Sequence, residues 1–219
     1  MAQVLLLTLL NIGCIAEDDM LNQSEIFNVD TTVPENEQII DYRYTPIVEP
    51  VLVMGDSIAL GVGGKLTSSY TLAAGGERIE TTESLWRTRA GSYPSVTTIV
   101  VVSGINDIEH YDAEDILVIA KRFISDMRNH DRRVVYLGMT PALCNSIPGR
   151  NTPAWYSNCA EYNELINDEK IDIVDLWPLV GDPITHCLLP AYDSGDGLHP
   201  NGAGNKVIAD YLLGKRLPI

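Results

Sequence analysis

Short apolar runs alternate with amphipathic stretches along most of the chain. Residues 51–54 (VLVM) and 98–103 (TIVVVS) are mostly apolar or β-branched and are bounded by turn formers, a pattern typical of strands buried on both faces. Residues 113–130 instead repeat apolar side chains at the helical period. The same criteria predict further strands at 70–74, 133–139 and 171–176, and helices at 59–68, 81–89, 154–167 and 202–213.

This alternation of strands and helices predicts a single α/β domain over residues 49–219. Parallel strands that are joined by helices form a central sheet with helices on both of its faces. We therefore predict a three-layer α/β/α sandwich with a central parallel sheet, of the flavodoxin-like kind. The length of 219 residues suits one domain with a sizeable core.

Residues 1–14 have the features of an export signal. The apolar run 4–10 is too short to cross a bilayer as a helix, and Gly13-Cys14 and then acidic residues follow it. A small residue before a cysteine at this point resembles a bacterial lipoprotein processing site, although no Lys or Arg precedes the run and Asn11 interrupts it. We predict an exported protein, either secreted or anchored in the cell envelope through a lipidated Cys14. A buried first strand is the alternative.

Acidic residues dominate the charge of the chain. It has 30 Asp and Glu against 15 Lys and Arg, a net charge of −15 at pH 7. Nucleic-acid partners are disfavoured, because phosphates require a basic surface. Residues 15–48 contain many of these acids and lack a sustained period, so we interpret them as an acidic lead-in or tether.

The cysteines fit an exported protein better than a metal site. No two of them have C-x-x-C spacing and no histidine lies at zinc-finger spacing, so no metal site is predicted. The segment between Cys144 and Cys159 contains Pro, Gly and Asn and has the composition of a loop. A Cys144–Cys159 disulfide would staple this loop, and reduced, buried cysteines are the alternative.

Polar groups gather where the predicted strands end. Ser57 follows the run 51–54, Asn106 follows 98–103, and His199 lies just before the last helix. The carboxyl ends of parallel strands meet at one edge of a sheet, where ligands bind. A hydroxyl, a carboxamide, an imidazole and several glycine amides at one edge are the groups that nucleophilic acyl transfer needs.

Three short blocks carry a family resemblance. GDSI at 55–58, GIND at 104–107 and DGLHP at 196–200, in this order, resemble the blocks of the SGNH hydrolases, also called GDSL-type esterases. The match extends over about residues 51–213. It implies the sandwich fold above and hydrolysis of a carboxylic ester through an acyl-enzyme, with no metal or organic cofactor.

The resemblance also assigns catalytic roles. Ser57 would be the nucleophile and His199 the base that takes its proton. Asp196, three residues earlier, would hold the other ring nitrogen of His199 without accepting the proton itself. Asp193 is a competing candidate for the acid, but its spacing from the histidine does not match the family. Taken alone, Ser57 is also a common type of helix N-cap.

An oxyanion hole completes the implied site. The backbone amides of Ser57 and Gly76 and the side-chain amide of Asn106 would bind the developing negative charge. Gly76 is chosen because it precedes a Glu-Arg turn after a short strand, and Gly75 or Gly91 remain alternatives.

Several neighbouring polar residues are interpreted as structural. Asp56 is expected to bond turn amides and Asp107 to form a turn. His110, His130 and His186 are expected to face solvent.

The substrate is less constrained than the reaction. A short domain with little room for a lid or a long acyl tunnel, together with export, favours an O-acetyl ester of a carbohydrate. The alternatives are a lysophospholipase or thioesterase-type acyl hydrolase, and a non-catalytic glycan-binding envelope protein on the same fold.

Overall fold

The computed structural model describes residues 45–140, 143–167 and 171–215. The described residues all belong to one compact unit, Gln38–Ile219. The predicted signal segment 1–14, with Cys14, and nearly all of the acidic lead-in 15–48 lie outside the described residues. Ile47 is an exception, since its side chain is buried in the core and its N–H donates to the carbonyl of Leu212 at 2.9 Å. The folded part therefore extends upstream of Pro50.

The centre of the fold is a five-stranded sheet in which all the paired strands are parallel, with the order β2-β1-β3-β4-β5. Every residue of β1 and β3 is buried, as continuous apolar runs predict. In the register of these two strands, Gly55 pairs with Val102 at their carboxyl ends. The strands are β1 (Val51–Gly55), β2 (Ser69–Ala73), β3 (Thr98–Val102), β4 (Arg133–Leu137) and β5 (Asp172–Val174).

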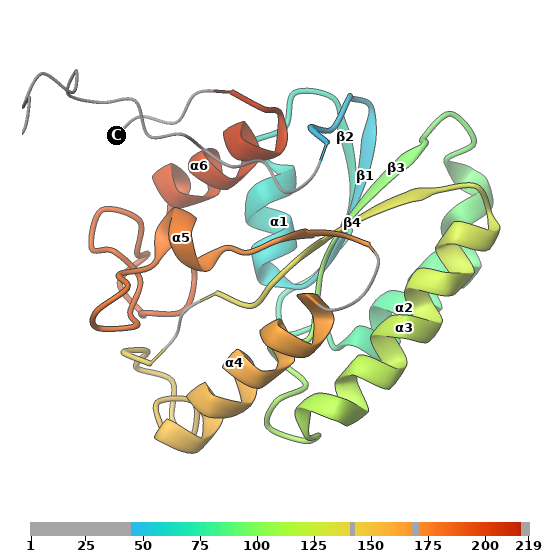
Figure 1. The fold of residues 1–219 in the computed structure, drawn as a ribbon. Helices are drawn as coiled ribbons and strands as arrows, with labels where there is room; N and C mark the ends of the chain where they lie inside the picture. Colours follow the sequence, from blue (N-terminus) through green and yellow to red (C-terminus); the bar gives the residue numbers. More distant parts are fainter. Residues whose placement is uncertain (1–44, 141–142, 168–170, 216–219) are drawn as a thin grey trace, which may run out of the picture. The chain divides into compact units, whose positions relative to one another are not determined.

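Helices cover both faces of this sheet, which confirms the predicted sandwich. Figure 1 shows α1 and α6 on one face and α2, α3 and α4 on the other. The predicted helix 59–68 is displaced, because α1 begins at Ser57 and ends at Gly63, where another glycine follows. The helices are α1 (Ser57–Gly63), α2 (Ile79–Arg89), the 3₁₀ turn η1 (Ala90–Ser92), α3 (Ala113–Asn129), α4 (Pro153–Asn167), α5 (Trp177–Val180) and α6 (Gly202–Leu212).

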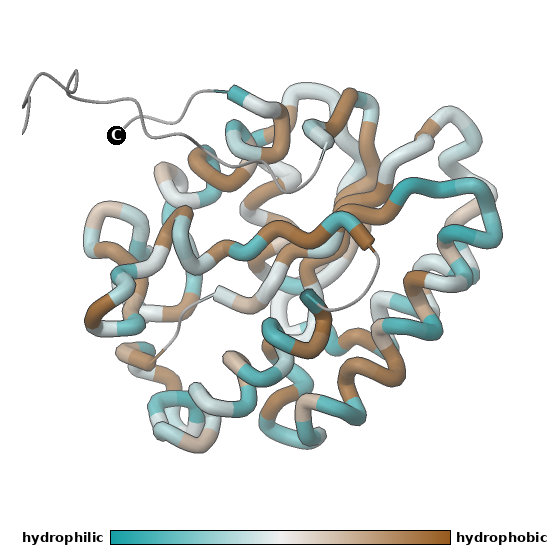
Figure 2. The backbone as a smooth tube through the Cα atoms, viewed as in Figure 1, coloured by the Kyte–Doolittle hydropathy of each residue, from teal (hydrophilic) through white to brown (hydrophobic). Residues whose placement is uncertain are grey.

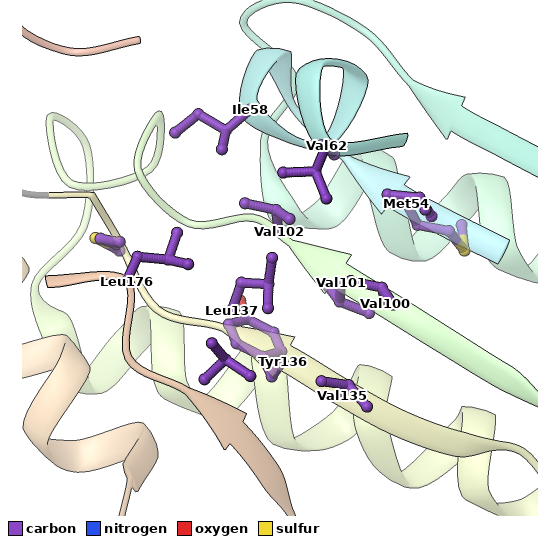
Figure 3. Packing of buried hydrophobic residues seen from close by; sticks show 14 of the residues in the cluster. Met54, Ile58, Val62, Val100, Val101, Val102, Val135, Tyr136, Leu137 and Leu176 are labelled. Atoms are coloured by element: carbon purple, nitrogen blue, oxygen red, sulfur yellow. The ribbon is translucent and has the colours of Figure 1, made fainter. Parts of the chain in front are cut away.

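The core lies on both sides of the central strands. Figure 2 shows the hydrophobic segments concentrated in the strands and on the inner sides of the helices. In Figure 3, Ile58 and Val62 of α1 lie above Val102 of β3, and Leu137 of β4 lies below it. All four of these side chains are at most 3% exposed. The strand ends that carry the polar residues are therefore held by a close-packed interior.

The disulfide differs from the predicted one. Cys144 is bonded to Cys187, and Cys159 is a free, buried thiol. The prediction was wrong because the segment before Cys159 is not all loop. Helix α4 begins at Pro153 and carries Cys159 into the core, where it is 2% exposed. The loop after α5 instead lies beside Cys144, and the Leu143 N–H donates to the carbonyl of His186 at 3.2 Å.

Candidate active site

The turn from β1 into α1 requires a glycine. Gly55 has φ +137°, and a Cβ there would lie 1.7 Å from the carbonyl oxygen of Val102 in β3. The next residue, Asp56, donates its N–H to the same carbonyl at 3.1 Å. The close approach of β1 and β3 thus excludes any larger residue. From β1 the connection to β2 runs toward one edge of the sheet, and the connection from β2 to β3 returns to the other side of β1. Ligand crevices of parallel sheets form at such a switch point, here between β1 and β3.

Asp56, and not Ser57, caps the helix that follows. Its Oδ1 accepts a hydrogen bond from the Ile58 N–H at 2.9 Å, so Asp56 is the N-cap and Ser57 the first residue of α1. The helix-cap interpretation of Ser57 is therefore wrong. The structural role expected for Asp56 is confirmed. With the cap supplied by its neighbour, the hydroxyl of Ser57 is available to another partner.

That partner is His199, which links Ser57 to Asp196. The Ser57 Oγ lies 2.8 Å from His199 Nε2, and His199 Nδ1 lies 2.6 Å from Asp196 Oδ2. The other carboxylate oxygen, Oδ1, accepts the backbone N–H groups of Leu198 and His199, each at 2.9 Å. The structure brings all three predicted triad residues together, although they come from β1–α1 and from the loop before α6.

The charge on Asp196 determines the tautomer of His199. Partial burial raises the pKa of this carboxyl, but hydrogen bonds from the backbone and ring of His199 and from the Leu198 N–H outweigh it, lowering the pKa to about 2. An ionised carboxylate only accepts hydrogen bonds, so His199 Nδ1 must carry a proton. In the neutral ring, Nε2 is then an acceptor that faces the Ser57 hydroxyl.

Asp193 does not reach His199 and instead shapes the loop. Its Oδ1 accepts the N–H groups of Gly195 and Gly197, each at 2.9 Å. Both glycines have positive φ, and a Cβ on Gly197 would lie 2.6 Å from the carbonyl oxygen of Cys144. Asp193 therefore holds the turn that presents Asp196, and the geometry supports Asp196 as the acid.

Asn106, one of the candidate oxyanion groups, lies beside the β2–α2 loop that contains Gly76. The Asn106 Nδ2 donates to the carbonyl of Glu77 at 2.9 Å, which places the carboxamide next to the loop containing Gly76. Gly76 has φ +75°, a conformation that favours glycine. Gly91 lies in η1, and the ring of Tyr93, two residues later, packs on that of Tyr70 near the amino end of β2, at the end of the strand opposite to the β2–α2 loop. Gly75 lies in the same loop as Gly76 and remains an alternative.

Asp107 contributes more than a turn. Its Oδ2 accepts the N–H of Ile79, the first residue of α2, at 3.0 Å, so it fastens the start of that helix to the end of β3. The side chain is fully buried, and this burial raises the pKa of Asp107 to about 6, against the lowering effect of the Ile79 N–H.

Sequence reasoning missed residues in the loop after β4. The Ser146 N–H donates to the carbonyl of Asp196 at 2.8 Å, and Arg150 Nη1 donates to Asn106 Oδ1 at 3.0 Å. Neither residue belongs to a recognisable motif, and both contacts cross more than 40 positions of sequence. Only the placement of this loop over the sheet edge reveals them.

The three other histidines lie outside the triad. His110 and His130 are exposed, as predicted. His186 is half-buried, and its ring centroid lies 5.1 Å from that of Tyr156 and 5.2 Å from that of Trp177. The expectation that it faces solvent was wrong, because its ring packs against these two aromatic side chains.

We expect Asp56 to make the fold less stable at higher pH. The side chain is 0% exposed, and burial raises its pKa to about 7 despite hydrogen bonds from the Ile58 and Ala59 N–H groups. In the unfolded chain the carboxyl ionises near its ordinary value of 3.8, so stability falls as pH rises between 3.8 and about 7. One pKa unit corresponds to about 1.4 kcal/mol, so the total is on the order of 4 kcal/mol.

Thermal unfolding of the wild type and of Asp56→Asn at about pH 5 and about pH 8 measures this contribution. Asparagine keeps the oxygen that caps Ile58 but cannot ionise. The variant should therefore lose less stability than the wild type over this range. Equal pH dependence of the two proteins would contradict the assignment. The raised pKa of Asp107 also lowers stability as pH rises, but Asp107 is present in both proteins, so its contribution cancels when they are compared.

The described part of the chain contains neither a candidate metal-binding cluster nor a helix that could span a membrane. Within residues 45–140, 143–167 and 171–215, no group of three or more His, Cys, Asp or Glu side chains is placed to hold a metal ion. Over the same part of the chain, none of the helices combines the length and apolarity that crossing a membrane requires.

Comparisons with known proteins agree with the fold and the blocks. The sequence profile of the GDSL-like Lipase/Acylhydrolase family matches residues 53–207, well over half of the chain. No curated protein sequence matches the chain. Among solved structures, a GDSL-like lipase from Bacteroides thetaiotaomicron superposes with a TM-score of 0.60 and 19% identity, over 76% of this chain and 88% of its own.

Two further structures are similar in fold. An acylhydrolase candidate from Bacteroides fragilis has a TM-score of 0.61 and 20% identity, and the match covers 89% of this chain and 95% of that one. An acetyl-xylooligosaccharide esterase from a Geobacillus species has a TM-score of 0.59 and 14% identity, covering 78% of this chain and 96% of its own. At these identities the likeness establishes the fold.

Proposed function

Because the chain belongs to the GDSL-like lipase/acylhydrolase family, we propose that it hydrolyses a carboxylic ester with Ser57 as the nucleophile. One arrangement carries the proposal: the Ser57 Oγ lies 2.8 Å from His199 Nε2, and the other ring nitrogen, Nδ1, lies 2.6 Å from Asp196 Oδ2. A serine hydroxyl becomes a nucleophile when a positioned base takes its proton. The contacts supply that base and the group that orients it.

The reaction would proceed through two transfers of the acyl group. His199 Nε2 takes the proton of the Ser57 hydroxyl as Oγ attacks the ester carbonyl, and a tetrahedral oxyanion forms. The C–O bond to the alcohol then breaks, and His199 returns the proton to the leaving alkoxide. His199 Nε2 then takes a proton from a water molecule as its oxygen attacks the acyl-Ser57 ester. When the bond between the acyl carbon and Ser57 Oγ breaks, His199 returns this proton to Oγ and the carboxylic acid is released.

The oxyanion would be met by three N–H groups. These are the backbone amides of Ser57 and Gly76 and the second N–H of the Asn106 carboxamide, whose first N–H donates to Glu77. Such donors stabilise the transition state more than the substrate, because the charge develops only during the reaction. Loss of one donor typically costs about 3–4 kcal/mol.

We propose an acetyl group on a carbohydrate as the acyl substrate. One similar structure bears the name of an acetyl-xylooligosaccharide esterase, which supports this choice at the level of the fold. Export, predicted from residues 1–14, would bring the enzyme to surface glycans, with lipidated Cys14 as a membrane anchor in one form of the proposal. The family is described as one of lipases and acylhydrolases, so lipid and other acyl esters are the second candidate class of substrate.

The substrate proposal predicts a steep preference for short acyl chains. We expect kcat/KM on p-nitrophenyl esters to fall from acetate to butyrate to octanoate, and acetate to be released from acetylated xylooligosaccharides. A preference for octanoate would favour the lipid-directed or thioesterase-type alternative. No turnover of any ester, together with no labelling by a fluorophosphonate probe, would indicate a non-catalytic glycan-binding protein.

A further inference from the structure

The loop at residues 143–152 connects two parts of the candidate site. At one end, the Ser146 N–H donates to the carbonyl of Asp196 at 2.8 Å. At the other end, Arg150 Nη1 donates to Asn106 Oδ1 at 3.0 Å. The Cys144–Cys187 disulfide ties the start of the loop to the segment after α5. One loop thus contacts both the acid of the triad and the carboxamide of the oxyanion hole.

The contacts of Asn106 determine which way its carboxamide points. A carboxamide can rotate by half a turn, which exchanges its oxygen and its nitrogen. A guanidinium has only donors and a backbone carbonyl has only acceptors. With Arg150 on one side and the Glu77 carbonyl on the other, only one orientation forms two hydrogen bonds. In the reverse orientation, the amide nitrogen would face the Arg150 guanidinium, donor against donor. The amide oxygen would face the Glu77 carbonyl, acceptor against acceptor.

The satisfied orientation leaves one N–H of Asn106 for the substrate. The amide nitrogen has two hydrogens, and the Glu77 carbonyl takes one of them. The positive guanidinium on Oδ1 also draws electron density from the nitrogen, so the remaining N–H becomes a stronger donor.

Arg150 is itself held in place. Its Nε donates to Glu109 Oε1 at 2.5 Å, and its side chain is 14% exposed. The backbone is fixed as well, since the Asn145 Nδ2 donates to the Arg150 carbonyl at 2.6 Å. A charged side chain this covered, with a carboxylate on one side and Asn106 on the other, presents a fixed donor and not a mobile one.

We propose that Arg150 is a positioning residue for catalysis, which orients and polarises the Asn106 carboxamide toward the oxyanion. The inference rests on the proposed function, because it assigns Asn106 to the oxyanion hole. Arg150 acts through Asn106 and needs no contact with the substrate. Nothing in its local sequence indicates this role.

The test compares Arg150→Met in the wild-type and Asn106→Ala backgrounds, with p-nitrophenyl acetate as the substrate. Removal of an oxyanion donor typically costs about 100- to 1,000-fold in kcat. Arg150→Met should lower kcat by about 10- to 100-fold, a part of that loss, with little change in KM. In the Asn106→Ala background, the same substitution should have little further effect. Arg150→Lys should recover part of the loss, because a lysine can donate one hydrogen bond to Oδ1.

Arg87→Met is the matched control, because Arg87 also pairs with a carboxylate, Glu83, but near the end of α2 that lies away from the site. It should leave kcat unchanged. Thermal unfolding of each variant shows whether the fold persists, and Arg150→Lys carries the test if Arg150→Met does not fold.

Three results would overturn the inference. The first is full kcat in Arg150→Met while Ser57→Ala is inactive, which leaves the proposed function intact. The second is an equal loss in both backgrounds, which would indicate a general structural role. The third is an inactive wild type whose Ser57 resists a fluorophosphonate, which would overturn the proposed function as well.

Discussion

Ser57→Ala should reduce kcat on p-nitrophenyl acetate by about 10⁶-fold, the scale seen when a serine hydrolase loses its nucleophile. The variant has no oxygen to form the acyl-enzyme, so only binding and the oxyanion groups remain. Its fold should persist, because the hydroxyl contacts His199 and the cap of α1 is supplied by Asp56. Steady-state kinetics and thermal unfolding of the purified variant provide the measurement.

Ser84→Ala is the matched control for this substitution. Ser84 is exposed on α2, and its backbone carbonyl accepts a hydrogen bond from Thr88 Oγ1 at 3.0 Å, a contact that alanine keeps. Its kcat should equal that of the wild type. A Ser57→Ala protein that keeps most of its turnover would show that another group is the nucleophile.

Asp196→Asn should lower kcat by about 10⁴-fold, as the corresponding change does in serine proteases. Asparagine keeps Oδ1, which accepts the N–H groups of Leu198 and His199. It replaces Oδ2, which faces His199 Nδ1, with the amide nitrogen Nδ2, which would donate a hydrogen bond to Nδ1. His199 would then carry its proton on Nε2 and could not accept one from Ser57. The loss of activity would thus come from the wrong tautomer of His199, and not from a change in the shape of the loop.

Asp193→Asn provides the comparison within the same loop. It retains the Oδ1 that accepts from Gly195 and Gly197, so the turn should keep its shape and kcat should fall by no more than a few-fold. If Asp193→Asn were as damaging as Asp196→Asn, the acid would have to be assigned to Asp193. Alanine is a poorer choice at this position, because it would remove the oxygen that holds both glycine amides.

The strands, and the meeting of the candidate triad residues at one site, could be predicted because each has a local signature. Continuous apolar runs identified β1 and β3, and the blocks around Ser57 and His199 stand at the ends of predictable elements. Helix α1 was displaced in the prediction, because the cap depends on the Asp56 side chain turning back to Ile58. Helix α5, at four residues, is too short to show a period.

The contacts that were missed join segments far apart in sequence. Arg150 reaches Asn106 across 44 positions, and Cys144 reaches Cys187 across 43. Composition suggested that Cys159 closes a loop, whereas α4 buries it in the core. Such pairings depend on how β4, α4 and α5 pack together. The hydrophobic period of a single segment contains no information about this packing.

The most direct test of the central claim is the site at which an activated serine probe binds covalently. The protein should be treated with a fluorophosphonate, digested with trypsin and analysed by mass spectrometry. Cleavage after Arg43 and Lys65 yields a peptide of residues 44–65, in which Ser57 is the only serine. We expect the phosphonyl adduct on Ser57 of this peptide, and none in the His199→Ala protein. An active enzyme that is labelled elsewhere, or not at all, would contradict the assignment of Ser57.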